Sequence, residues 1–148
     1  MGNDQGCAPR SGRADFDRRH RFNLVATYRL PWDFRLGGIV SISSGPPFNI
    51  TTGFDKNHDT VANHRPPGVT RNTGQGPGFA SVDLRSSKVF RFEEDNSRRE
   101  VELAIDAFNL FNHVNPKNFV GTLTSPFFGR ANASSPARQL QLSLRYHF

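Results

Sequence analysis

Cysteine and long apolar runs are both scarce in this sequence of 148 residues. The single cysteine, Cys7, excludes an internal disulfide framework and a zinc site built from cysteines. No apolar run exceeds three residues, whereas a transmembrane helix needs roughly 20. A helical membrane protein is therefore excluded. The net charge of +6 still permits an anionic partner, whether nucleic acid or acidic lipid.

The apolar residues that are present alternate with polar ones, which is typical of strands with two unlike faces. The clearest case is 139–148, where every even position is apolar and every odd position is polar. Similar alternation predicts five strands, at about 19–30, 34–44, 79–92, 99–111 and 138–148. Lys88 falls on the apolar face of its strand, where a bulge or a snorkelling side chain would accommodate it.

The connections between these strands alternate between short and long. Residues 31–33 and 93–98 form short turns, whereas 45–78 and 112–137 form long loops. Outer-membrane β-barrels have short periplasmic turns and long external loops. The sequence therefore predicts an all-β fold, an antiparallel up-and-down transmembrane β-barrel segment in the bacterial outer membrane. We expect residues 1–18 to be a disordered remnant of an external loop and 19–148 to form the barrel strands.

Five strands are too few for a complete barrel, because bacterial single-chain barrels have an even number of at least eight. Both edges of the predicted sheet would lack a partner, which the bilayer does not tolerate. We therefore expect an incomplete barrel, a fragment of a longer chain.

Several short motifs point to a known family. They are DRRHRF (17–22), SGPPF (44–48), NHRP (63–66), VDLRSSK (82–88), AFNLFNH (107–113), RQLQ (138–141) and RYHF (145–148). In this order they resemble the C-terminal end of TonB-dependent outer-membrane receptors, most closely the Oar-like receptors with an N-terminal carboxypeptidase-regulatory-like domain.

The resemblance implies a barrel of about 22 strands around a plug, of which this chain holds the last five. It also implies import of a substrate too large for porins, such as a siderophore or a carbohydrate. The TonB complex would be contacted through an N-terminal part that this sequence lacks.

The terminal strand resembles the signal that the barrel-assembly machinery recognises. Its extended edge offers backbone groups for strand addition, and the alternate side chains select the register. The alternative is an ordinary edge strand that ends in phenylalanine. The residues of the signal are Leu140, Leu142, Leu144, Tyr146 and Phe148.

A calcium site is one interpretation of residues 55–59. Asp55, Asn57 and Asp59 place oxygen ligands at alternate positions, as an EF-hand loop does. Thr60 and Pro66 stand where that loop needs glycine and glutamate, which excludes the EF-hand itself. A turn rich in aspartate and asparagine is the favoured alternative, and no other cofactor is expected.

Charged residues suggest two further surfaces. Three arginines lie at the start of the first predicted strand: Arg18, Arg19 and Arg21. They would either contact lipopolysaccharide phosphates or form a solvated rim. No nucleic-acid-binding module is recognisable, and we expect no such partner. A second set is expected to face the barrel lumen and to pair internally: Arg29, Arg35, Asp83, Arg85, Arg91, Glu102, Asp106, Arg145 and His147.

No catalytic constellation is present, so we do not expect an enzyme. The histidines lack the HExxH spacing, and neither the serines nor Cys7 lie in a nucleophile motif. The alternative to a receptor is a soluble secreted β-sheet module that binds carbohydrate or a polyanion. That alternative requires the apolar faces to meet across a sandwich.

Overall fold

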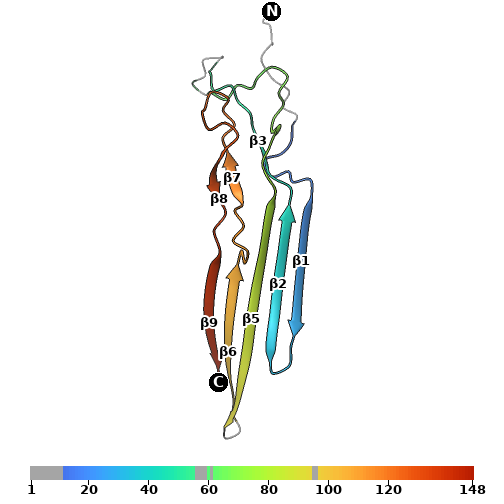
Figure 1. Ribbon diagram of the computed structural model, residues 1–148, viewed down its shortest axis with the longest axis vertical. Coiled ribbons are helices and arrows are strands. Elements are labelled where there is room, and N and C mark those ends of the chain that lie inside the picture. Colours follow the sequence, from blue (N-terminus) through green and yellow to red (C-terminus); the bar gives the residue numbers. More distant parts are fainter. Residues whose placement is uncertain (1–11, 56–59, 61, 95–96) are drawn as a thin grey trace, which may run out of the picture. The chain divides into compact units, whose positions relative to one another are not determined.

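The computed structural model describes residues 12–55, 60, 62–94 and 97–148, which contain nine strands and no helix (Figure 1). Accordingly, the described chain has no helix long and apolar enough to cross a bilayer. The chain divides into two compact units, a sheet unit (21–42, 80–114 and 136–148) and a loop unit (1–20, 43–79 and 115–135).

The sheet unit is a single five-stranded sheet in the order β1-β2-β5-β6-β9. Its strands are β1 (Arg21–Arg29), β2 (Phe34–Ser43), β5 (Phe79–Glu94), β6 (Ser97–Phe108) and β9 (Gln139–His147). Neighbouring strands run in opposite directions (Figure 1), and the pairs β5–β6 and β6–β9 are antiparallel in register. This up-and-down order agrees with the all-β antiparallel prediction.

The hairpin of β5 and β6 is longer than the sequence pattern predicts. Backbone pairing continues to Glu94 and Ser97, so most of the charged segment 93–98, expected as a turn, is strand. Alternation ends there because charged positions replace apolar ones, but polar residues still pair through their backbones. Loss of the hydrophobic pattern therefore did not mark the end of the strand.

At its other end β6 stops at Phe108, earlier than the expected 111. Asn109 and Asn112 both have positive φ, 50° and 53°. Asparagine enters this left-handed region more readily than most residues, and strands cannot continue through it. The two asparagines thus end the strand despite the apolar Leu110 and Phe111.

The loop unit contains structure where long loops were expected. Within 45–78, β3 (Pro47–Phe48) pairs with β4 (Gly74–Gln75), and within 112–137, β7 (Pro116–Phe119) pairs with β8 (Ala131–Ser134). The rings of Phe48 and Phe119 stack with centroids 5.5 Å apart. A Cβ at Gly74 would lie 2.6 Å from the ring of Phe48, so glycine is what allows this close packing.

Residues 12–18, expected as part of a disordered remnant, are held within the loop unit. The buried Asn72 donates from Nδ2 to the carbonyl of Arg13 at 2.7 Å and to Oδ1 of Asp15 at 2.6 Å. Arg71 also pairs with Asp15 at 2.9 Å. The hydrogen bonds from Asn72 first and Arg71 second lower the pKa of Asp15. Because this segment is polar, the hydrophobic pattern did not predict these long-range contacts.

Candidate membrane-facing surface and lumen wall

One face of the sheet carries large apolar side chains that remain exposed. The register aligns Leu140 with Ala107 and Ala107 with Leu84, and it aligns Leu144 with Leu103 and Leu103 with Lys88. The sets expected to be apolar in these three strands therefore share one face. Leu140, Leu142 and Leu144 are 71%, 71% and 72% exposed. A sheet folding in water would cover such a face.

The opposite face carries charged and small residues, and it contains most of the buried positions of the sheet. Ser87, Val89, Ala104 and Asp106 are buried there, whereas the apolar face contributes only Ala107 among the described residues. Burial of small and polar groups beside exposed leucines is the reverse of a soluble protein. It suits a wall with lipid on one side and a wet lumen on the other.

Ion pairs connect three strands across this polar face. Arg85 donates to both carboxylate oxygens of Asp106 at 3.1 Å, and it lies 3.8 Å from Glu102. Glu102 also lies 3.8 Å from Arg145 in β9. The structure therefore brings together four of the residues expected in the lumen: Arg85, Glu102, Asp106 and Arg145.

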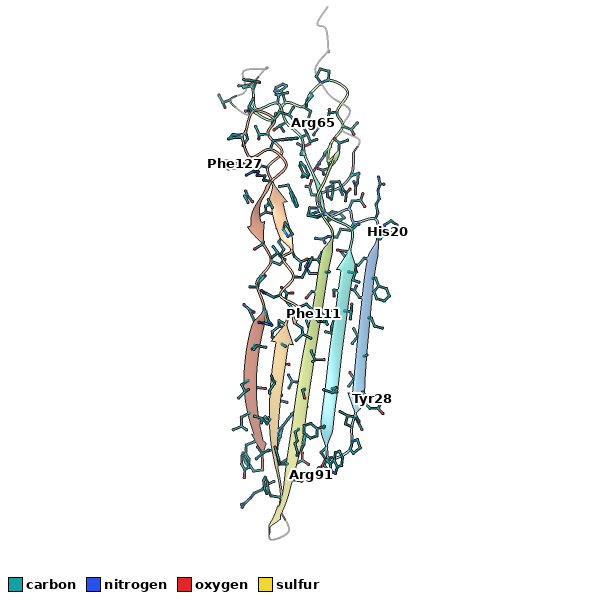
Figure 2. All side chains as sticks on the ribbon, in the orientation of Figure 1. His20, Tyr28, Arg65, Arg91, Phe111 and Phe127 are labelled. Carbon is teal, nitrogen blue, oxygen red and sulfur yellow. The ribbon has the colours of Figure 1, made fainter. Side chains whose placement is uncertain are left out.

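Other residues of the expected lumen set lie elsewhere on the sheet. Arg91 pairs with Asp33 at 2.8 Å and with Glu100 at 3.2 Å, near the short-turn end of β5 (Figure 2). Arg29 and Arg35 are exposed and form no ion pair within the described residues. These three arginines therefore lie outside the network of Arg85, Glu102, Asp106 and Arg145.

A polar cluster that the sequence pattern missed surrounds Asn109, which is buried. Its backbone N–H donates to Oδ1 of Asp83 at 2.8 Å. Its side-chain Nδ2 donates to the carbonyls of His113 and Pro136, and its Oδ1 accepts from the His113 N–H at 2.9 Å. These bonds tie the ends of three strands together. The AFNLFNH motif contains Asn109 and His113, but not the other two partners, Asp83 and Pro136.

Lys88 lies on the apolar face, as the alternation predicts. Its ammonium lies 4.7 Å from the ring centroid of Phe34 and 4.9 Å from that of Phe90. The β5–β6 register is continuous from Leu84 to Glu94, so the alternative of a bulge in this pair is wrong. Cation–π contacts with two rings accommodate the charge instead.

The terminal strand presents its apolar residues on one face, and Tyr146 and Phe148 stack with centroids 6.0 Å apart. β9 pairs with β6 from Gln139 to His147. Within the described residues no strand pairs with its other edge. An extended edge of this kind has the form that strand addition requires, but recognition by the assembly machinery stays a prediction.

The calcium interpretation falls partly outside the described residues, because Asn57 and Asp59 belong to the segment 56–59. Asp55 is described, and its Oδ2 accepts a hydrogen bond from the Thr60 N–H at 2.8 Å. In the described ranges no group of three histidine, cysteine or acidic residues could hold a metal. Calcium binding and the turn alternative both stay predictions.

The three arginines proposed to contact lipopolysaccharide have different environments. Arg18 is half-buried and donates to Oγ of Ser43 at 2.7 Å. Arg19 is exposed, and Arg21 is the exposed first residue of β1. Arg18 is thus already engaged within the loop unit, and the lipid contact stays a prediction.

An antiparallel meander with an exposed apolar face and an ion-paired polar face defines a β-barrel wall. The family described as "outer membrane beta barrel domain" matches residues 67–141, just over half of the chain. The chain belongs to this family, and the protein is located in the bacterial outer membrane. No curated protein and no solved structure matches the chain.

Proposed function

We propose that the chain is part of a TonB-dependent receptor that binds and imports a substrate too large for porins, such as a siderophore or a carbohydrate. The observation that carries the proposal is the ordered series of motifs from residue 17 to residue 148, which resembles the C-terminal end of such receptors. The family match supports the coarser assignment to an outer-membrane barrel.

In this proposal the sheet unit supplies the closing strands of the barrel. The ion-paired face, with Arg85, Glu102, Asp106 and Arg145, lines the lumen, where charged groups stay hydrated. The leucines of β9 face lipid. The terminal strand carries the signal for the barrel-assembly machinery, and the TonB complex acts through residues outside this sequence.

Uptake measurements in the source bacterium test the import function. A strain that lacks the gene and a strain that lacks TonB are each compared with the parent for growth on a panel of iron–siderophore complexes and oligosaccharides. We expect one substrate on which both mutants fail, while cells without TonB still bind that substrate at the surface. Equal growth of all three strains on every substrate of the panel would contradict the proposal.

The soluble-module alternative is not pursued, because the family is one of outer-membrane barrels. The leucine-rich face of the sheet is exposed, and in a barrel such a face meets lipid.

A further inference from the structure

We propose that Lys88 binds the phosphate of a phospholipid whose acyl chains lie along the apolar face of the sheet. The inference rests on the transmembrane placement of the sheet and goes beyond import. It assigns a specific lipid-binding position to a residue that breaks the alternation of β5.

The ammonium of Lys88 has no anionic partner among the described residues. The continuous register keeps Lys88 on the apolar face, level with Leu103 and Leu144. Among the described residues its ammonium contacts only the rings of Phe34 and Phe90 and has no carboxylate partner. A lipid-facing lysine near the membrane surface is attracted by anionic headgroups. A phosphate would provide the counter-charge without moving the strand.

The height of Lys88 in the membrane follows from the register. The Val89 N–H donates to the Asp33 carbonyl at 3.2 Å, so the first short turn is level with Lys88 and Leu144. β9 nevertheless continues to His147 and the chain to Phe148. If this turn and Phe148 lie at one membrane surface, the strands tilt by roughly 35°, given about 3.3 Å per residue and 4.8 Å between strands.

That tilt agrees with the 35–45° of outer-membrane barrels. The surface then crosses β5 close to Phe90, the next lipid-facing position after Lys88 on the way to the turn. A lysine side chain is long enough to extend its ammonium from here to the headgroups. The nearby aromatic residues are those of an interfacial belt.

The occupant is a phospholipid because the position combines one cation with apolar neighbours. A free phosphate would leave the exposed Leu103 and Phe90 without a partner, whereas acyl chains cover them. The short turns of outer-membrane barrels are periplasmic, so Lys88 meets the inner leaflet. Lipopolysaccharide phosphates would lie at the opposite ends of the strands.

Native mass spectrometry of the full-length protein, folded in a non-ionic detergent, tests the proposal with phosphatidylglycerol as the probe. We expect Lys88→Gln to weaken phosphatidylglycerol binding about fivefold, the effect of one lysine near a lipid surface. Lys88→Arg should retain binding. Lys117→Gln, which removes the same charge from β7, should bind like the wild type.

Two probes distinguish the source of the phosphate. Diacylglycerol, which lacks phosphate, should bind equally to the wild type and to Lys88→Gln. Lipid A should show no dependence on Lys88, and a dependence as strong as that of phosphatidylglycerol would overturn the inner-leaflet placement. Unchanged phosphatidylglycerol binding by Lys88→Gln, or equal loss in Lys117→Gln, would overturn the site.

A measurement on the wild type avoids any effect of substitution on folding. Phosphatidylglycerol should protect Lys88 from an amine-reactive reagent, and Lys117 should react at the same rate with and without lipid. Absence of protection at Lys88 would overturn the proposal. Heat-modifiable gel mobility reports separately whether the protein forms a barrel. If the wild type shows no TonB-dependent uptake but still binds phosphatidylglycerol at Lys88, the import function alone is contradicted.

Discussion

Arg85 and Asp106 lie directly opposite each other in β5 and β6, and Nη1 of the arginine donates to both carboxylate oxygens at 3.1 Å. Their side chains are 47% and 12% exposed. The carboxylate is therefore shielded from water on the polar face, while the guanidinium is partly hydrated. The pair connects two wall strands on the side opposite the leucines.

A double-mutant cycle with Arg85→Ala and Asp106→Ala measures this pair. We expect Arg85→Ala to lower the free energy of unfolding by about 1–3 kcal/mol, because it leaves a shielded carboxylate without its main donor. The coupling energy should be about 1 kcal/mol, since the arginine is half exposed. Urea titration of the protein in lipid vesicles gives both values. The more exposed pair Arg91 and Asp33 is the control, and stronger coupling there would contradict the prediction.

Arginine substitutions distinguish the two faces of β9. Leu142→Arg should reduce stability by roughly 2–4 kcal/mol if the position lies near the membrane midplane, because the charge would face hydrocarbon. Gln141→Arg, on the opposite face, should have little effect. Urea unfolding in vesicles compares them, and equal tolerance of both substitutions would rule out the assignment of faces.

The polar cluster at the end of β6 predicts two different effects at position 109. Asn109→Gly keeps the positive φ of 50° accessible but loses the three side-chain hydrogen bonds, which we expect to destabilise by about 2–4 kcal/mol. Asn109→Ala should destabilise by about 1 kcal/mol more, the strain of a left-handed alanine. Thermal unfolding in detergent ranks the variants, and an alanine variant as stable as the glycine variant would argue against backbone strain.

The terminal strand predicts an assembly defect without a folding defect. Deletion of Phe148 should strongly reduce the amount of heat-modifiable protein in the outer membrane, because an edge strand is recognised through its alternate side chains. The same variant should refold in detergent as fast as the wild type. His147→Ala, on the polar face, is the control. Normal membrane levels after the deletion would contradict an assembly signal.

The hydrogen bonds to Asp15 predict a local pH dependence. Folding lowers its pKa below the ordinary 3.8, so the contribution of this carboxylate is fully present above that value and is lost as pH falls through the lower folded-state pKa. The contact with Asn72 should be the same at pH 7 and pH 5 and weaken only in stronger acid. NMR shifts of the Asn72 side-chain amide should show this transition, and Asp15→Asn should abolish it. A transition above pH 5 would contradict the assignment.

The sequence by itself determined the five long strands, the chemistry of their two faces and the position of Lys88 on the apolar face. Alternation is a local property with a period of two, so it can be read without knowing which strands are neighbours. The membrane setting follows from the same pattern, because a barrel wall needs only one apolar face on each strand. For these reasons the all-β antiparallel fold was predictable.

Only the tertiary structure decided the partners of individual residues. Three contacts join segments that are far apart in the chain. They are the pairing of Arg85 with Asp106, the bonds that end β6 at Asn109 and the contact of Asn72 with Asp15. The sequence pattern also did not predict the short sheets within the long loops. Their glycines and prolines are typical of turns. Register and contact geometry depend on the whole sheet, whereas the alternation that predicted the strands depends only on neighbours in sequence.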